Sequence, residues 1–92
     1  MIHEIVQVIP IKYFKVYLYF SDGRIKLFDA AEIIKKGIFE QLNDLDVFIN
    51  TCTVLNHTLA WDLAGNYDPY KCLDLDPEVL YKNSEDVKDP LT

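Results

Sequence analysis

The sequence predicts a small α+β domain in two layers, with short helices packed on an antiparallel sheet. Two segments, residues 10–29 and 51–62, carry β-branched and aromatic residues around short polar turns, which is typical of hairpins. Two others, residues 30–43 and 77–83, carry helix-capping residues. A chain of 92 residues has material for one hydrophobic core, so we expect residues 1–82 to form a single domain and residues 83–92 a polar acidic tail that frays.

The Asp22-Gly23 pair predicts the first hairpin, because it lies between two alternating apolar runs. A two-residue turn at this pair would place Phe20 opposite Ile25. Residues 2–9 read as a preceding strand, which Pro10 interrupts because proline has no N–H to donate to a sheet. The hairpin would then have one wholly apolar face, formed by Val16, Leu18, Phe20, Ile25 and Leu27.

The second hairpin turns at Asn56 and His57, since asparagine tolerates the positive φ that a two-residue turn requires. This turn pairs Leu55 with Thr58 and, further along the strands, Cys52 with Trp61. Residues 64–70, which follow, have loop composition.

The two helical segments are predicted from their caps. Asp29 with Glu32 forms a capping box for residues 30–43, and Gly37 supplies a left-handed stop within it. Asp76 caps the helix at residues 77–83, and Pro77 occupies the first helical position, where its missing N–H costs nothing.

The charge distribution restricts the partners. The chain carries 15 acidic and 9 basic residues, a net charge of −6, which opposes indiscriminate attraction to nucleic acid or anionic lipid. Residues 1–28 carry a local charge of +2, whereas residues 29–73 and 74–92 each carry −4. Only the first third of the chain could therefore favour an anion.

Membrane and redox signals point to the cytoplasm. No apolar stretch approaches the roughly 18 to 20 residues of a membrane span, and the first residues lack a signal-peptide pattern. Cys52 and Cys72 read as reduced, buried thiols. We expect a cytoplasmic protein with no membrane association.

Candidate catalytic and metal-binding groups have simpler interpretations. His3, His57 and the two cysteines lack the short spacings of zinc sites, and the aspartates after Trp61 lack the calcium-loop pattern. No histidine accompanies a nucleophile in a recognisable arrangement, and each of the three glycines has a turn or cap role. We therefore expect a protein that is not an enzyme and needs no cofactor.

The second face of the first hairpin is the candidate interaction surface. It would combine aromatic and basic side chains, which is unusual for a purely solvated face. Another segment, such as residues 66–81, could pack over it, or it could bind a second copy or a partner protein, because Tyr and Arg are enriched at interfaces. Single-stranded nucleic acid is the remaining alternative, since stacking platforms use the same mixture. Its predicted members are Tyr13, Lys15, Tyr17, Tyr19, Arg24, Lys26 and Phe28.

Almost the whole chain resembles a prokaryotic family, domain of unknown function 2442. The resemblance is carried by a phenylalanine before the Asp-Gly turn, a tryptophan strand and a closing Leu-Tyr motif. The matching segments are residues 20–23, 28–29, 37–39, 59–62 and 73–81, with Leu42 and Phe48.

The resemblance implies a small α+β sheet with helices on one face and no established activity. Some relatives carry an added helix-turn-helix domain, and others are encoded beside small proteins in arrangements that look like toxin–antitoxin pairs. This chain ends soon after the Leu-Tyr motif, so we expect no DNA-binding extension. We expect a non-enzymatic protein-interaction module, with a toxin–antitoxin-like pair as one form of partnership and single-stranded nucleic-acid binding as the alternative.

Overall fold

The computed structural model describes residues 3–35, 37–63 and 73–90. Two antiparallel sheets form the frame. The four-stranded sheet has the order β1 (Ile5–Ile11), β2 (Lys15–Phe20), β3 (Ile25–Asp29), β7 (Glu85–Asp86). The three-stranded sheet has the order β4 (Cys52–Leu55), β5 (Thr58–Trp61), β6 (Leu73–Asp74).

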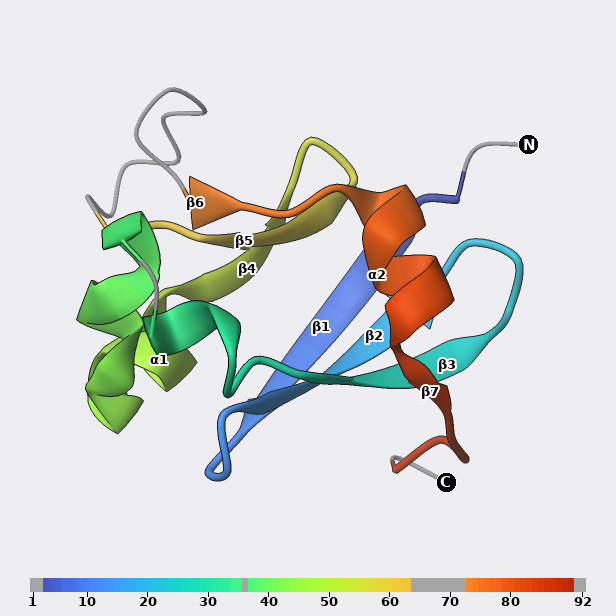
Figure 1. Cartoon of the computed structure of the whole chain (residues 1–92). Coiled ribbons are helices and arrows are strands. Elements are labelled where there is room, and N and C mark those ends of the chain that lie inside the picture. Colours follow the sequence, from blue (N-terminus) through green and yellow to red (C-terminus); the bar gives the residue numbers. More distant parts are fainter. Residues whose placement is uncertain (1–2, 36, 64–72, 91–92) are drawn as a thin grey trace.

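Short helical segments complete the domain and confirm the predicted α+β class. They are the 3₁₀ turns η1 (Ile33–Lys35) and η2 (Gly37–Asn43) and the helices α1 (Leu45–Thr51) and α2 (Pro77–Asn83). Figure 1 shows the 3₁₀ turns and α1 gathered at one end of the sheets, with α2 beside β2 and β3. The two predicted hairpins lie in separate sheets rather than in one, and the Ile5 N–H, which donates to the His57 carbonyl at 2.8 Å, links them.

The β2–β3 turn differs from the prediction by one residue. Phe20 N–H donates to the Arg24 carbonyl at 2.9 Å, and Gly23 N–H donates to the Phe20 carbonyl at 3.0 Å. The loop therefore contains Ser21, Asp22 and Gly23, with Gly23 in the left-handed region at φ +91°. Three-residue hairpin loops end on such a left-handed residue, whereas the predicted loop contained Asp22 and Gly23 alone.

This shift exchanges the two faces of β3. Tyr17 lies opposite Leu27, and Leu18 lies opposite Lys26. Opposed residues project on the same side of a sheet, so Lys26 and Phe28 join the inner face and Ile25 and Leu27 join the face of the tyrosines. The predicted assignment of these β3 side chains was wrong, whereas that of the β2 side chains was right.

β1 corrects a second expectation. The strand continues through Pro10, which lies opposite Val16, to Ile11. Proline is tolerated there because β1 is at the edge of its sheet and needs no donor on the outer side. β1 also contains a bulge between Ile5 and Gln7.

The second hairpin has the predicted register. Leu55 lies opposite Thr58, and Cys52 opposite Trp61. Asn56 and His57 have positive φ values of 53° and 64°, as a two-residue turn of this kind demands. The predicted loop at residues 64–70 lies outside the described residues.

The helices agree only in part with the boundaries predicted from their capping residues. α2 begins at Pro77 as predicted, with the Asp76 side chain accepting from Glu78 N–H. Residues 30–43 form two 3₁₀ turns rather than α-helix, and Gly37, at φ +45°, has the left-handed conformation predicted for it. Asp29, the expected cap, ends β3 and accepts from Ala31 N–H. Asp44 caps α1, a helix that was not predicted from the sequence.

The core lies between the inner face of the four-stranded sheet, the second sheet and the helices. Trp61, the chain's one tryptophan, is fully buried at its centre, with ring centroids 5.6 Å from Phe48 and 6.4 Å from Phe39. The other buried apolar side chains come from β1, β2, both 3₁₀ turns, both helices, β5 and the residue after β3: Ile5, Val16, Leu18, Phe20, Ala30, Ile34, Leu42, Phe48, Leu59 and Leu80.

Replacing Gly23 tests the three-residue turn. A Cβ at Gly23 would meet no atom within 4 Å, so the cost of Gly23→Ala comes from the left-handed backbone alone. We expect Gly23→Ala to lower the free energy of unfolding by about 1–2 kcal/mol, measured by urea denaturation. Gly23→Asn is the matched control and should lose less, because asparagine adopts this conformation more readily. Equal losses in the two variants would contradict this account.

Candidate interaction surface

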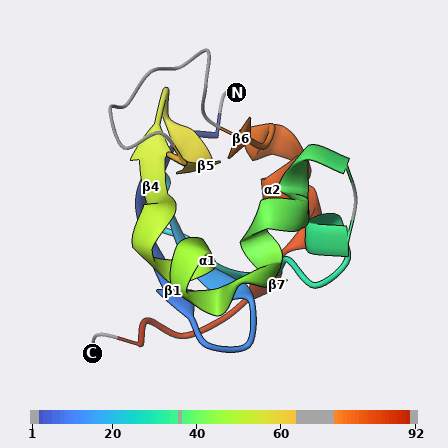
Figure 2. The same ribbon diagram turned by 90° about the vertical axis from the view of Figure 1, so that its left-hand side faces the viewer.

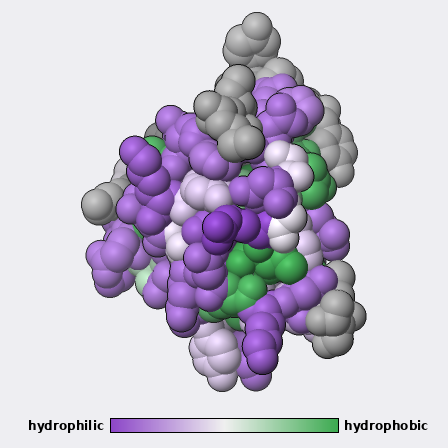
Figure 3. Space-filling model, turned by 90° about the vertical axis from the view of Figure 1, so that its right-hand side faces the viewer, coloured by the Kyte–Doolittle hydropathy of each residue, from purple (hydrophilic) through white to green (hydrophobic). Residues whose placement is uncertain are grey.

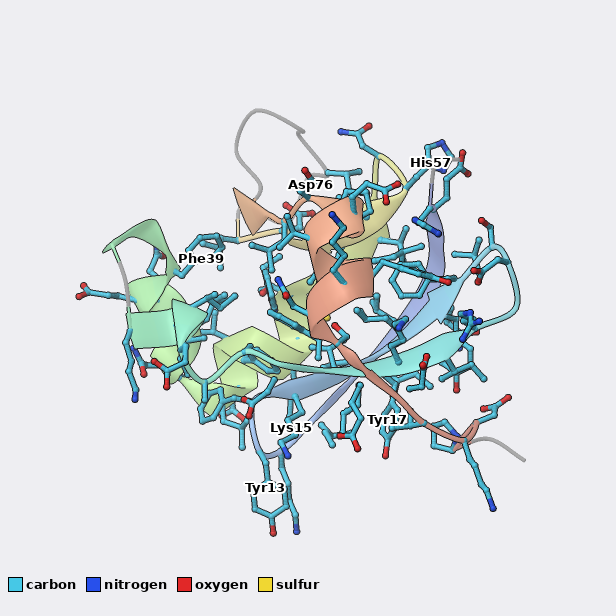
Figure 4. The ribbon with its side chains drawn as sticks, turned by 45° about the vertical axis from the view of Figure 1, so that its right-hand side comes forward. Tyr13, Lys15, Tyr17, Phe39, His57 and Asp76 are labelled. Atoms are coloured by element: carbon cyan, nitrogen blue, oxygen red, sulfur yellow. The ribbon has the colours of Figure 1, made fainter. Side chains whose placement is uncertain are left out.

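The side of the four-stranded sheet away from the core carries an apolar and tyrosine-rich surface, which we call the outer face. Strand pairing places its members together, since Gln7, Ile9 and Ile11 of β1 lie opposite the odd-numbered residues of β2. Figure 4 shows Tyr13, Lys15 and Tyr17 extending from the sheet on the side away from α2. The pairing also places Gln7 and Asp29 on this side, at the margins of the surface. The outer face between them consists of Ile9, Ile11, Lys15, Tyr17, Tyr19, Ile25 and Leu27.

Every member of the outer face is partly exposed to solvent, and none is fully buried. The inner face differs sharply, because Val16, Leu18 and Phe20 are at most 3% exposed. On the side that carries the β2–β3 turn, Figure 3 shows a compact hydrophobic patch framed by hydrophilic residues. Strands with two apolar faces are expected where a sheet is covered on both sides.

The structure places only three of the seven predicted surface residues on the outer face. Lys15, Tyr17 and Tyr19 lie on the outer face as expected. Tyr13, in the β1–β2 turn, is 68% exposed, and Lys12 Nζ lies 5.3 Å from its ring centroid. The three others are Arg24 at the end of the turn, Lys26 with 7% exposure, and Phe28 packed against the core.

This division weakens the nucleic-acid alternative. Lys26 is nearly buried, and its Nζ contacts Asp86 Oδ1 at 3.1 Å. Arg24 has carboxylates of Asp22 and Asp86 at 4.0 Å and 3.7 Å. Of the three basic residues predicted for this surface, only Lys15 remains on the outer face, so the continuous basic track that a phosphate backbone requires is absent from these residues.

The segment after α2 crosses the edge of the outer face. Asp86 lies opposite Lys26 in β7, and Val87 N–H donates to the Ile25 carbonyl at 3.0 Å. Asp89 Oδ1 then accepts from the Tyr19 hydroxyl at 2.7 Å. Residues 83–92, expected to be a polar tail, thus include a short strand that contacts the predicted surface.

Tyr19 is held in its neutral form by this contact. Desolvation and the hydrogen bond to Asp89 raise the pKa of Tyr19 to about 12. Its hydroxyl therefore acts as a donor to a carboxylate at any physiological pH.

A second cluster fixes α2 on the opposite side. The Tyr81 ring stacks on His3 at a centroid distance of 3.6 Å and meets Phe20 edge-on at 4.9 Å, and its hydroxyl donates to Asp22 Oδ2 at 2.8 Å. Lys26 Nζ lies 4.5 Å from the Tyr81 centroid. No local sequence pattern predicts this cluster, because its members lie far apart along the chain.

Glu78 joins the same cluster to the start of the chain. Its Oε2 lies 2.6 Å from His3 Nδ1, and its Oε1 accepts from His3 N–H at 2.9 Å. These hydrogen bonds hold the pKa of Glu78 below its ordinary value of 4.5. The pKa of Asp22 is also lowered, chiefly by the Arg24 backbone N–H and further by the Tyr81 hydroxyl. Both carboxylates therefore favour the folded state once they are ionised.

The other sequence candidates are dispersed. Cys52 is partly buried beside the core, and burial raises the pKa of its thiol to about 12, while Cys72 lies outside the described residues. Within the described ranges, no group of three or more His, Cys, Asp or Glu side chains is placed to hold a metal, and no surface pocket is present. None of the helices described here has the length and apolarity needed to cross a membrane.

The fold and this surface define a small α+β domain with two antiparallel sheets and a partly exposed second apolar face. Residues 5–86 match the family described as Protein of unknown function (DUF2442), so the chain belongs to that family. No curated protein and no solved structure matches the chain.

The Glu78 contacts predict a pH-dependent stability. Because the pKa of Glu78 is lower in the folded chain, its contribution is present above about pH 4.5 and is lost as the pH falls through the folded pKa. We expect the melting temperature of Glu78→Gln to lie below that of the wild type at pH 6, and the gap to shrink as the pH falls below about 4.5. Thermal unfolding followed by circular dichroism at each pH measures it.

His3→Ala provides the matched control for this prediction. In a Glu78→Gln background, His3→Ala should cost less than it does in the wild type, because the two side chains act through one contact. Strict additivity, or a gap that does not change with pH, would contradict the assignment.

Proposed function

We propose that this protein is a non-enzymatic protein-interaction module that binds a partner protein through the outer face. The observation that carries the proposal is the row of partly exposed Ile, Leu and Tyr side chains on the side of the sheet away from α2. A monomeric domain rarely leaves a contiguous apolar face of this kind in water. Tyrosine is also enriched at protein interfaces, because its ring buries area while its hydroxyl keeps a hydrogen bond.

The charge of the domain favours a protein over a nucleic acid as the partner. The net charge of −6 opposes phosphate, and the Arg24 and Lys26 side chains both contact Asp86. The protein is proposed to bind its partner in the cytoplasm, the compartment expected from the sequence. The partner protein is one encoded beside this chain, as in toxin–antitoxin-like pairs. Inspection of the adjacent reading frames tests whether such a partner exists.

Tyr17→Ala tests the outer face as the binding surface. Tyr17 lies at its centre, opposite Ile9 on one side and Leu27 on the other. In pull-downs from nuclease-treated extract of the native organism, we expect the variant to retain a specific partner roughly tenfold less than the wild type does, since central aromatic residues dominate interface energies. Retention is quantified by mass spectrometry.

Val79→Ala is the matched control, because Val79 is 52% exposed on α2 and lies away from the outer face. It should retain the partner at the wild-type level. Loss of retention in both variants, or in neither, would overturn the proposal. Light scattering on the purified wild type shows whether the partner is a second copy of this chain.

A further inference from the structure

The contacts of residues 85–89 show which peptide chemistry the edge of the outer face accepts. Tyr19, Arg24, Ile25 and Lys26 make these contacts, and we call them the tail site. The bound segment is extended, and Figure 2 shows the chain after β7 running toward the side of the molecule on which β1 lies. The chain thus fills part of its own surface.

Three successive contacts define the recognition. Asp86 forms ion pairs with two cationic side chains: its Oδ1 lies 3.1 Å from Lys26 Nζ, and its Oδ2 lies 3.7 Å from Arg24 Nη1. Val87 follows with its N–H on the Ile25 carbonyl, and continuation of the β3–β7 register places its side chain on the outer face. Asp89 accepts from the Tyr19 hydroxyl.

After Asp86, alternation separates the contacting side chains of this segment from its solvated ones. Val87 and Asp89 are half-buried, whereas Lys88 and Pro90 are exposed. The contacting pattern is therefore an acidic residue, an aliphatic residue, any residue and a second acidic residue in extended conformation.

The attachment of the segment is short. β7 contributes two residues opposite β3, a strand of five, and side chains of both Glu85 and Asp86 are exposed. So few backbone contacts at a sheet edge place this segment among the parts of a domain that open without global unfolding. An added strand from another protein uses the same edge hydrogen bonds.

We infer that the tail site is a docking site for an extended acidic–aliphatic–x–acidic segment of the partner protein, and that residues 85–90 occupy it in the partner's absence. This inference rests on the proposed function and names its recognition chemistry and regulation. Partner binding displaces the chain's own segment, which competes at the high effective concentration of a tethered ligand.

The test uses the full-length chain and a labelled peptide with the sequence of residues 84–90, Ser-Glu-Asp-Val-Lys-Asp-Pro. Val87→Asp with Asp89→Ala weakens the chain's own segment and leaves the tail site intact. By fluorescence anisotropy, we expect this double variant to bind the peptide at least roughly tenfold more tightly than the wild type, where the tethered segment competes. Lys88→Ala, which alters an exposed residue of the same segment, should behave as the wild type does.

Receptor-side changes test specificity. Adding Tyr19→Phe to the double variant removes the hydrogen bond to the second acidic residue and should weaken peptide binding roughly threefold to tenfold. Adding Arg24→Ala should reduce both the affinity and its dependence on salt. Absence of peptide binding to the double variant, or equal binding to every variant, would overturn the inference.

Hydrogen exchange on the wild type gives an independent test that needs no substitution. The Val87 amide, bonded to the Ile25 carbonyl, should exchange through local opening and be insensitive to low denaturant, unlike the Leu18 amide in the buried strand. Exchange of Val87 only through global unfolding would overturn displacement. Peptide binding and hydrogen exchange are both measured without a partner protein. A negative result in either one is therefore distinguishable from a negative result in the Tyr17→Ala pull-down.

Discussion

The hydrogen bond from Gly23 N–H to the Phe20 carbonyl sets the side of the sheet on which every β3 side chain lies. It closes a loop of three residues, and one residue more or less would reverse the two faces of β3. With this loop, Lys26 faces inward and Leu27 faces outward. The outer face and the inner cluster around Tyr81 both depend on that choice.

The two faces of the four-stranded sheet differ in burial and in the contacts that their side chains make. On the inner side, Lys26 is nearly buried, and its charge is balanced by Asp86 and by the face of the Tyr81 ring. This arrangement joins β3, α2 and β7 and ties the helix to the sheet. On the outer side, Tyr17 points away from α2 and stays partly exposed, so the proposed binding surface and the cluster around Tyr81 lie on opposite sides of the sheet.

Local turn and capping chemistry was sufficient to predict the β4–β5 hairpin and the start of α2, because Asn56 and Asp76 act on their immediate neighbours. It could not predict the β2–β3 register, since an Asp-Gly pair is compatible with loops of two and of three residues. What favours the observed register is Lys26 meeting Asp86 and Tyr81, which lie far along the chain. The strand at residues 85–86 escaped prediction for the same reason: its sequence is acidic, and its pairing depends on β3.

The position of the chain's one tryptophan separates folding from binding in spectroscopic terms. Trp61 is fully buried beside Phe48, in β5 of the second sheet, whereas the outer face belongs to the four-stranded sheet. Its intrinsic fluorescence therefore reports the integrity of the core, whereas Tyr13 and Tyr17 lie at the surface. A change in tryptophan emission would therefore signal a disturbance of the core rather than an event at the outer face.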